Sequence, residues 1–193
     1  KDPKPGYEII QAPTSSNPHL PESYVQSLID IYPANLLAAY LEGKFVNLHS
    51  GTVYNNYDRI AHRSTMTADD SNLLRIGMDF NVTNMSAVVY ICHGDQWHAV
   101  NELKGIYDTP AMIRTIQSHY PNHTIRIYPD ASGRSRKTVD ASISDISLLE
   151  GAGFAVYANR ANPFVKDRIL AANTAFDKGR LFVNDNLCTE YDR

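Results

Sequence analysis

Two aspartates, each at the end of a predicted strand, are the feature that most constrains the fold of this chain. Asp79 ends an apolar run that begins at Leu74. Asp130 comes after a second apolar run, Thr124–Tyr128, and a proline. An acid in such a run is costly to bury unless it binds a partner or leaves the sheet at its edge. Because ligands in mixed sheets bind beyond the carboxyl ends of parallel strands, we expect both carboxylates at one edge.

The order of the predicted elements describes a mixed sheet with helices. The first strands are predicted at Leu74–Asp79, Ser86–Cys92 and Trp97–Leu103, and their short connections make them an antiparallel meander. Thr109 is the predicted N-cap of the first helix after them, with Pro110 at its first position. Helices and strands then alternate at Thr109–His119, Thr124–Tyr128, Ile143–Glu150, Phe154–Tyr157, Pro163–Lys178 and Arg180–Val183.

This order predicts the fold class. A meander of three antiparallel strands, followed by helix–strand units, is typical of an RNase H-like α/β domain. We therefore expect a mixed sheet, made of the meander plus parallel strands and flanked by helices. In such a domain, carboxylates from different strands share divalent metal ions.

The first 70 residues differ from the rest in pattern. Residues 1–24 carry five of the ten prolines and read as an extended linker. Two helices are expected after it, at about 21–31 and 33–41. We therefore predict a linker and N-terminal helical extension over residues 1–70, and the α/β domain over residues 71–193.

Composition excludes several classes of protein. The net charge of −3 gives no overall sign of nucleic-acid binding, although a local basic patch is compatible with it. Cys92 and Cys188 are far apart, so a disulfide framework or structural zinc site is not expected.

There is no signal peptide and no apolar run of membrane-spanning length, which makes a reducing, soluble compartment the expectation. No complete Walker A sequence is present, so ATP hydrolysis by this segment alone is not expected.

The candidate metal ligands and catalytic residues are Asp79 and Asp130. Mg²⁺ is usually held by one or two protein carboxylates plus water and phosphate, and a two-metal nuclease uses such ions at the cleaved bond. Glu102 is a further candidate ligand, on the assumption that the third strand lies beside the first. Each acid taken alone also fits a plainer interpretation, an aspartate that starts its own turn or an exposed acid at a sheet edge.

Basic residues follow the second aspartate. Arg134, Arg136 and Lys137 lie in the loop after Asp130, where cations can neutralise DNA phosphates. Lys166, on the long helix near the C-terminus, is a further candidate for DNA binding. The alternative for all four is an ordinary solvated surface.

Several segments together resemble one known family. They are Asn17–Tyr24, Tyr40–Val46 and Gly51–Tyr54, followed by Gly77-Met78-Asp79-Phe80 and Asp130-Ala131-Ser132-Gly133. In this order they resemble the linker and nuclease domain of large terminase subunits of tailed bacteriophages, most closely those of headful-packaging podophages. The resemblance covers nearly the whole chain.

The resemblance implies a metal-dependent endonuclease that cuts concatemeric double-stranded viral DNA during genome packaging. It implies magnesium or manganese, two ions in the complete site, with Asp79 and Asp130 as ligands. It further implies an ATPase domain in the same full-length protein, the small terminase subunit and the portal as partners, and the host cytoplasm during phage assembly as the location. Other RNase H-like nucleases, such as resolvases or integrases, and a non-catalytic docking module of a packaging motor remain alternatives.

One part of the family pattern is missing. The family has a third acid, usually on a late helix in an Asp-Ala context, and no such pattern follows Val183. We therefore expect the third ligand to lie C-terminal to Arg193.

Overall fold

The computed structural model describes residues 12–43, 53–81, 83–134 and 144–189. Its contacts divide the chain into two compact units. One comprises Lys1–Tyr57 with Val165–Lys178, and the other comprises Asp58–Phe164 with Gly179–Arg193. The predicted boundary at residue 70 stays a prediction.

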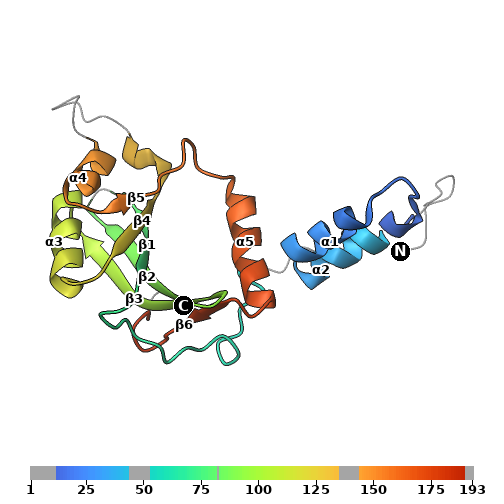
Figure 1. The fold of residues 1–193 in the computed structure, drawn as a ribbon, viewed down its shortest axis with the longest axis horizontal. Helices are drawn as coiled ribbons and strands as arrows, with labels where there is room; N and C mark the ends of the chain where they lie inside the picture. The colour runs from blue at the N-terminus through green and yellow to red at the C-terminus, as the bar shows by residue number, and fades with distance from the viewer. Residues whose placement is uncertain (1–11, 44–52, 82, 135–143, 190–193) are drawn as a thin grey trace. The chain divides into compact units, whose positions relative to one another are not determined.

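A six-stranded mixed sheet forms the centre of the second unit (Figure 1). The strand order is β5-β4-β1-β2-β3-β6. Neighbours β1, β2 and β3 are antiparallel, whereas β4 pairs parallel with β1, β5 with β4, and β6 with β3. This arrangement confirms the predicted fold class. The strands span Leu74–Asp79 (β1), Met85–His93 (β2), Gln96–Ile106 (β3), Ile125–Pro129 (β4), Ala155–Val156 (β5) and Leu181–Val183 (β6).

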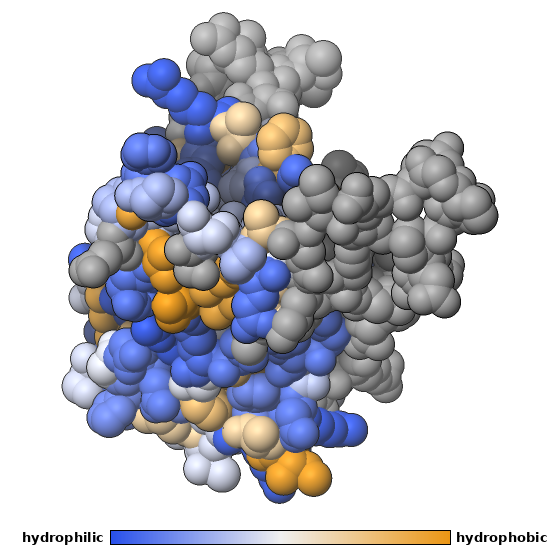
Figure 2. All heavy atoms as spheres, turned by 90° about the vertical axis from the view of Figure 1, so that its right-hand side faces the viewer, coloured by the Kyte–Doolittle hydropathy of each residue, from blue (hydrophilic) through white to orange (hydrophobic). Residues whose placement is uncertain are grey.

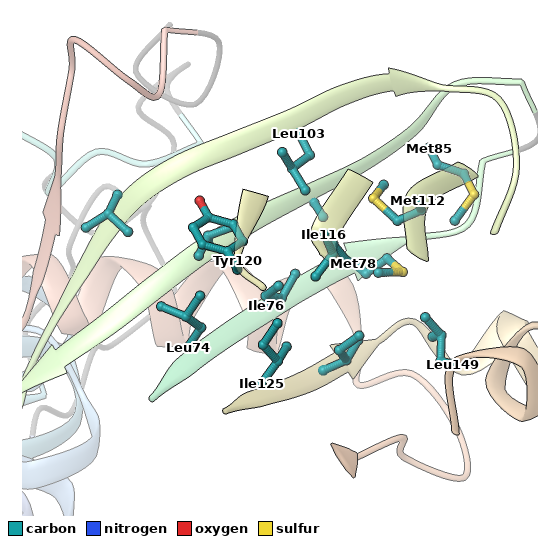
Figure 3. Close-up of a cluster of buried hydrophobic side chains, with 14 of the residues drawn as sticks. Leu74, Ile76, Met78, Met85, Leu103, Met112, Ile116, Tyr120, Ile125 and Leu149 are labelled. Carbon is teal, nitrogen blue, oxygen red and sulfur yellow. The ribbon is translucent and has the colours of Figure 1, made fainter. Parts of the chain in front are cut away.

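Two helices cover one face of this sheet, α3 (Thr109–His119) and α4 (Asp145–Gly151). Side chains alternate along a strand, so Leu74, Ile76 and Met78 of β1 all point into the core. There they pack with residues of both helices, including Met112, Ile116 and Leu149 (Figure 3). The intervening residues of β1, the last of which is Asp79, therefore belong to the opposite face.

The N-terminus of α3 differs from the prediction. Its N-cap is Asp108, which has extended backbone and accepts the Ala111 N–H at 2.8 Å. Thr109 is the first helical residue instead, and its hydroxyl donates to Asp145 Oδ1 at 2.7 Å. An aspartate caps as well as a threonine does. The Thr109 hydroxyl is therefore not needed as a cap, and its hydrogen bond to Asp145 links α3 to the first turn of α4.

The first unit contains η1 (Thr14–Ser16) and the helices α1 (Glu22–Ile31), α2 (Ala34–Glu42) and α5 (Val165–Asp177). Two polar side chains of α5 link this helix to earlier residues. Asn173 accepts the Asn56 N–H at 3.1 Å and donates to the Val53 carbonyl at 2.9 Å. Thr174 donates to the Ile31 carbonyl at 3.1 Å. These contacts explain why α5 groups with the N-terminal residues.

The surface is mixed in character. On the face drawn in Figure 2, hydrophilic residues predominate and hydrophobic ones form small patches. Among the residues that the structure describes, no helix is long and apolar enough to cross a membrane.

Candidate metal centre

The two aspartates leave the sheet from neighbouring parallel strands. Strands β1 and β4 pair in a register that runs to Met78 opposite Pro129. Asp79 and Asp130 each follow this last pair by one residue, and the Asp130 N–H donates to the Met78 carbonyl at 3.0 Å. Because side chains alternate, both aspartates belong to the face opposite the core. The structure therefore brings the two candidate ligands together at one edge of the sheet.

Each carboxylate is oriented by an asparagine side chain. Asp79 is exposed, and its Oδ2 accepts a hydrogen bond from Asn81 Nδ2 at 2.7 Å. Asp130 is half-buried, and its Oδ2 accepts from Asn162 Nδ2 at 2.8 Å. Its other oxygen, Oδ1, accepts the Ser132 N–H at 2.6 Å. A carboxylate oxygen can accept more than one bond, so these contacts leave acceptor capacity for a cation.

Asn162 makes a second contact that fixes the turn after β4. Its Oδ1 accepts the Ala131 N–H at 2.9 Å while its Nδ2 holds the Asp130 carboxylate. One amide thus anchors both the Asp130 carboxylate and the backbone that follows it. The sequence signals only a turn here, from the Asn-Pro pair at Asn162 and Pro163. Nothing local in the sequence identifies Asp130, 32 residues earlier, as the partner.

A glycine lets the two segments that carry Asp79 and Asp130 pack against each other. Gly133 is buried in the short helix η2 (Ala131–Arg134), and a Cβ added there would lie 2.2 Å from Cε2 of Phe80. Phe80 directly follows Asp79. The absent side chain therefore lets the loop after β4 lie against the end of β1.

We expect Gly133→Ala to lower the free energy of unfolding by about 1–3 kcal/mol, because the added methyl group forces the Phe80 ring out of its place. The measurement is urea unfolding followed by circular dichroism. Gly151→Ala is the matched control, since a Cβ at Gly151 meets no atom of the described residues within 4 Å. If the two variants unfold at the same urea concentration as the parent, the close packing of Phe80 on Gly133 is not a constraint.

Glu102 does not lie on a strand next to β1. In an antiparallel meander the second strand lies between the first and the third, and here β2 separates β3 from β1. The assumed adjacency is therefore wrong. Glu102 pairs with Val88, and its Oε1 accepts from Lys104 Nζ at 3.3 Å and from the Thr189 hydroxyl at 3.2 Å. Its role as a metal ligand stays a prediction.

The basic candidates fall in different places. Arg134 ends η2, four residues after Asp130, while Arg136 and Lys137 lie outside the described residues. Lys166 is exposed on α5, in the other compact unit.

The donor set at the edge of the sheet suits a hard divalent cation. Two carboxylates and nearby amide groups offer only oxygen ligands, the kind that Mg²⁺ and Mn²⁺ prefer. Within the described part of the chain, no group of three or more His, Cys, Asp or Glu side chains is arranged to hold a metal ion. Asp79 and Asp130 are thus two candidate ligands, and one or two carboxylates are what usually holds Mg²⁺ in proteins.

Comparison with known proteins identifies the fold. No protein-family model matches the sequence, and no curated protein matches it. Among solved structures, the large terminase of a thermophilic bacteriophage matches with a TM-score of 0.68 and 19% identity. The match covers 93% of this chain and 45% of that one. The same protein in complex with ATP-gamma-S gives the same TM-score, identity and coverage.

A shorter structure matches less closely. The nuclease domain of the bacteriophage SPP1 large terminase, with bound Mn, matches over 67% of this chain and 72% of its own, with a TM-score of 0.48 and 13% identity. The longer matches to the thermophilic phage protein are the informative ones. They confirm the resemblance at the level of the fold: this chain has the fold of a large terminase segment, and it spans less than half the length of the thermophilic phage protein.

Proposed function

We propose that this chain is a divalent-metal-dependent endonuclease that cuts double-stranded DNA. The observation that carries the proposal is the pair Asp79 and Asp130, which emerge at the same level from two adjacent parallel strands. Rigid strands hold the carboxylates in place, as metal-assisted hydrolysis of a phosphodiester requires. The fold shared with the large terminase of the thermophilic phage supports the same interpretation.

The residues have separate roles in this proposal. Asp79 and Asp130 hold the cation, and Asn81 and Asn162 keep the two carboxylates in one orientation. When bound, magnesium or manganese supplies positive charge that favours attack by water and stabilises the leaving oxygen. The packing of Phe80 on Gly133 keeps the two acidic segments together. A second ion in the complete site would need a further acidic ligand besides these two.

The proposed biological role is cleavage of concatemeric viral DNA during genome packaging, with headful cutting of low sequence preference. The partners in this role are an ATPase domain in the same full-length protein, the small terminase subunit and the portal, in the host cytoplasm. The similarity to a large terminase whose structures contain ATP-gamma-S or ADP supports the ATPase part of the proposal.

Supercoiled plasmid incubated with the chain and Mg²⁺ or Mn²⁺ tests the activity. We expect nicked and linear products at scattered positions, and none when EDTA removes the metal. The same assay separates a nuclease from a docking module that has kept only the fold. A folded chain that leaves the plasmid intact with either metal contradicts the proposed activity.

Asn162→Ala should weaken Mn²⁺ binding by roughly 10- to 100-fold, the usual effect of removing a residue that orients a metal ligand. The Asp130 carboxylate then loses its Oδ2 partner and the turn loses its anchor at Ala131. Isothermal titration calorimetry with manganese measures the change. Asn122→Ala is the control, since Asn122 is exposed in the turn before β4. An Asn162→Ala variant that binds manganese as tightly as the parent would remove Asn162 from the account.

A further inference from the structure

The face of the sheet that carries the two aspartates also carries a group of aromatic and basic side chains. Arg126 and Tyr128 of β4, and Asp130 directly after the strand, alternate with the buried Ile127 and Pro129, so all three share this face. Asp130 and Tyr128 are two residues apart, about 7 Å along the strand direction. The aromatic side chain is therefore a direct neighbour of the proposed metal centre.

Two tyrosines of this group stack on each other. The rings of Tyr128 and Tyr157 have centroids 5.3 Å apart and planes 18° apart. The Tyr157 N–H donates to the Ile127 carbonyl at 2.8 Å, which continues the pairing of β5 with β4 and fixes the two rings side by side. Arg126 places its guanidinium 5.7 Å from the centre of the Tyr157 ring.

This aromatic pair remains accessible. Tyr128, within β4, is 38% exposed, and Tyr157, directly after β5, is 51% exposed. On the β1 side the residue paired with Tyr128 is Gly77, which has no side chain. Among the described residues, a Cβ built at Gly77 would have only the Tyr90 ring near it, at 4.0 Å. The sheet is therefore open beside the Tyr128 ring.

We propose that Tyr128 and Tyr157, together with Arg126, form a stacking site for an unpaired nucleotide of the DNA strand that reaches Asp130. Base–aromatic stacking tolerates any sequence, because every base has a flat face. In a closed duplex these faces are hidden in the base stack, so an exposed tyrosine pair gains most from an unpaired base. The Arg126 guanidinium adds positive charge that complements the phosphates of the same strand.

This inference deepens the proposed function, because it rests on DNA as the substrate of the site. It adds to the proposed cleavage a preference of the site for one form of DNA. Single-stranded or locally opened DNA should bind next to the aspartates more tightly than a closed duplex of equal length and sequence.

The test is binding of short oligonucleotides that contain 2-aminopurine, measured by fluorescence in EDTA so that no metal chemistry contributes. We expect the parent chain to bind the single strand and to change its 2-aminopurine fluorescence. Tyr128→Leu and Tyr157→Leu should each weaken this binding by roughly 5- to 150-fold, the range for one base–aromatic stack. Binding of the fully paired duplex of the same length and sequence should change much less.

Three further variants make the test specific. Tyr128→Phe keeps the ring and should bind the single strand within about twofold of the parent, since stacking needs only the flat face. Gly77→Val leaves the tyrosines intact but fills the space beside Tyr128, and should weaken single-strand binding. Tyr24→Leu, at an exposed tyrosine of α1, should have no effect.

Two results would overturn the stacking site: leucine variants that bind the single strand like the parent, and leucine variants that lose single-strand and duplex binding to the same degree. A parent chain that binds no single strand overturns it as well. If the parent shows the tyrosine-dependent binding but does not cut plasmid with metal, the stacking site stands and the proposed nuclease activity fails.

Discussion

Asp79→Asn and Asp130→Asn should each abolish metal-dependent cutting of plasmid DNA, with a loss of at least about 100-fold in rate, because a bound metal contributes several kcal/mol to catalysis. Asparagine has the shape of aspartate but no negative charge, so it holds a divalent cation poorly. The fold should survive, because Asp79 is exposed at the end of β1 and Asp130 is only half-buried. Rates from linearisation of plasmid, together with circular dichroism spectra, measure both effects.

The matched control is Asp70→Asn, which removes the same charge at an exposed position before β1. This variant should cut like the parent. If Asp79→Asn and Asp130→Asn also cut like the parent, the assignment of the metal centre is wrong. If only one of them cuts, the two aspartates do not act as a pair.

Replacement of Arg134, Arg136 and Lys137 together by alanine should weaken DNA binding and flatten its dependence on salt. Each phosphate contact releases about one counterion, so the slope of log K against log salt should fall by up to about 3. The slope comes from fluorescence anisotropy titrations of a duplex at several salt concentrations. Because the loop follows Asp130 directly in sequence, its cations would contact phosphates close to the cut.

Lys104→Ala is the control for this triple variant, since Lys104 already forms an ion pair with Glu102 within the sheet. It should leave the salt slope as in the parent. An unchanged slope in the triple variant would make the three residues part of an ordinary solvated loop.

Local sequence predicts most of this fold because the signals of its elements are local. The bounds of β1 agree with the prediction, since β1 has clean alternation. Helix α3 ends at His119 as predicted, and it begins one residue before the predicted first position, with proline in its first turn. The other strands and helices of the α/β part differ from their predicted bounds by at most a few residues. Pairing is less local. Strand β6 pairs with β3 at the far edge of the sheet. The apolar pattern of Leu181–Val183 predicts a strand but does not indicate which strand it pairs with.

The same distinction divides the candidate site. Asp79 and Asp130 could be paired from sequence because each ends a strand, and the order of strands placed β4 beside β1. The prediction for Glu102 assumes that the third strand adjoins the first, whereas β2 lies between them in the meander. The sequence does not predict the role of Asn162. Its hydrogen bonds to Asp130 and Ala131 join two loops that are far apart in the chain, and no periodic pattern links such loops.

A crystal of this chain soaked in manganese tests the central claim most directly. Anomalous diffraction at the manganese absorption edge locates the ion without reference to the fold. The account predicts an anomalous peak bound by the carboxylates of both Asp79 and Asp130. A soaked crystal with ordered Asp79 and Asp130 side chains and no peak between them, or with manganese bound only elsewhere, would contradict it.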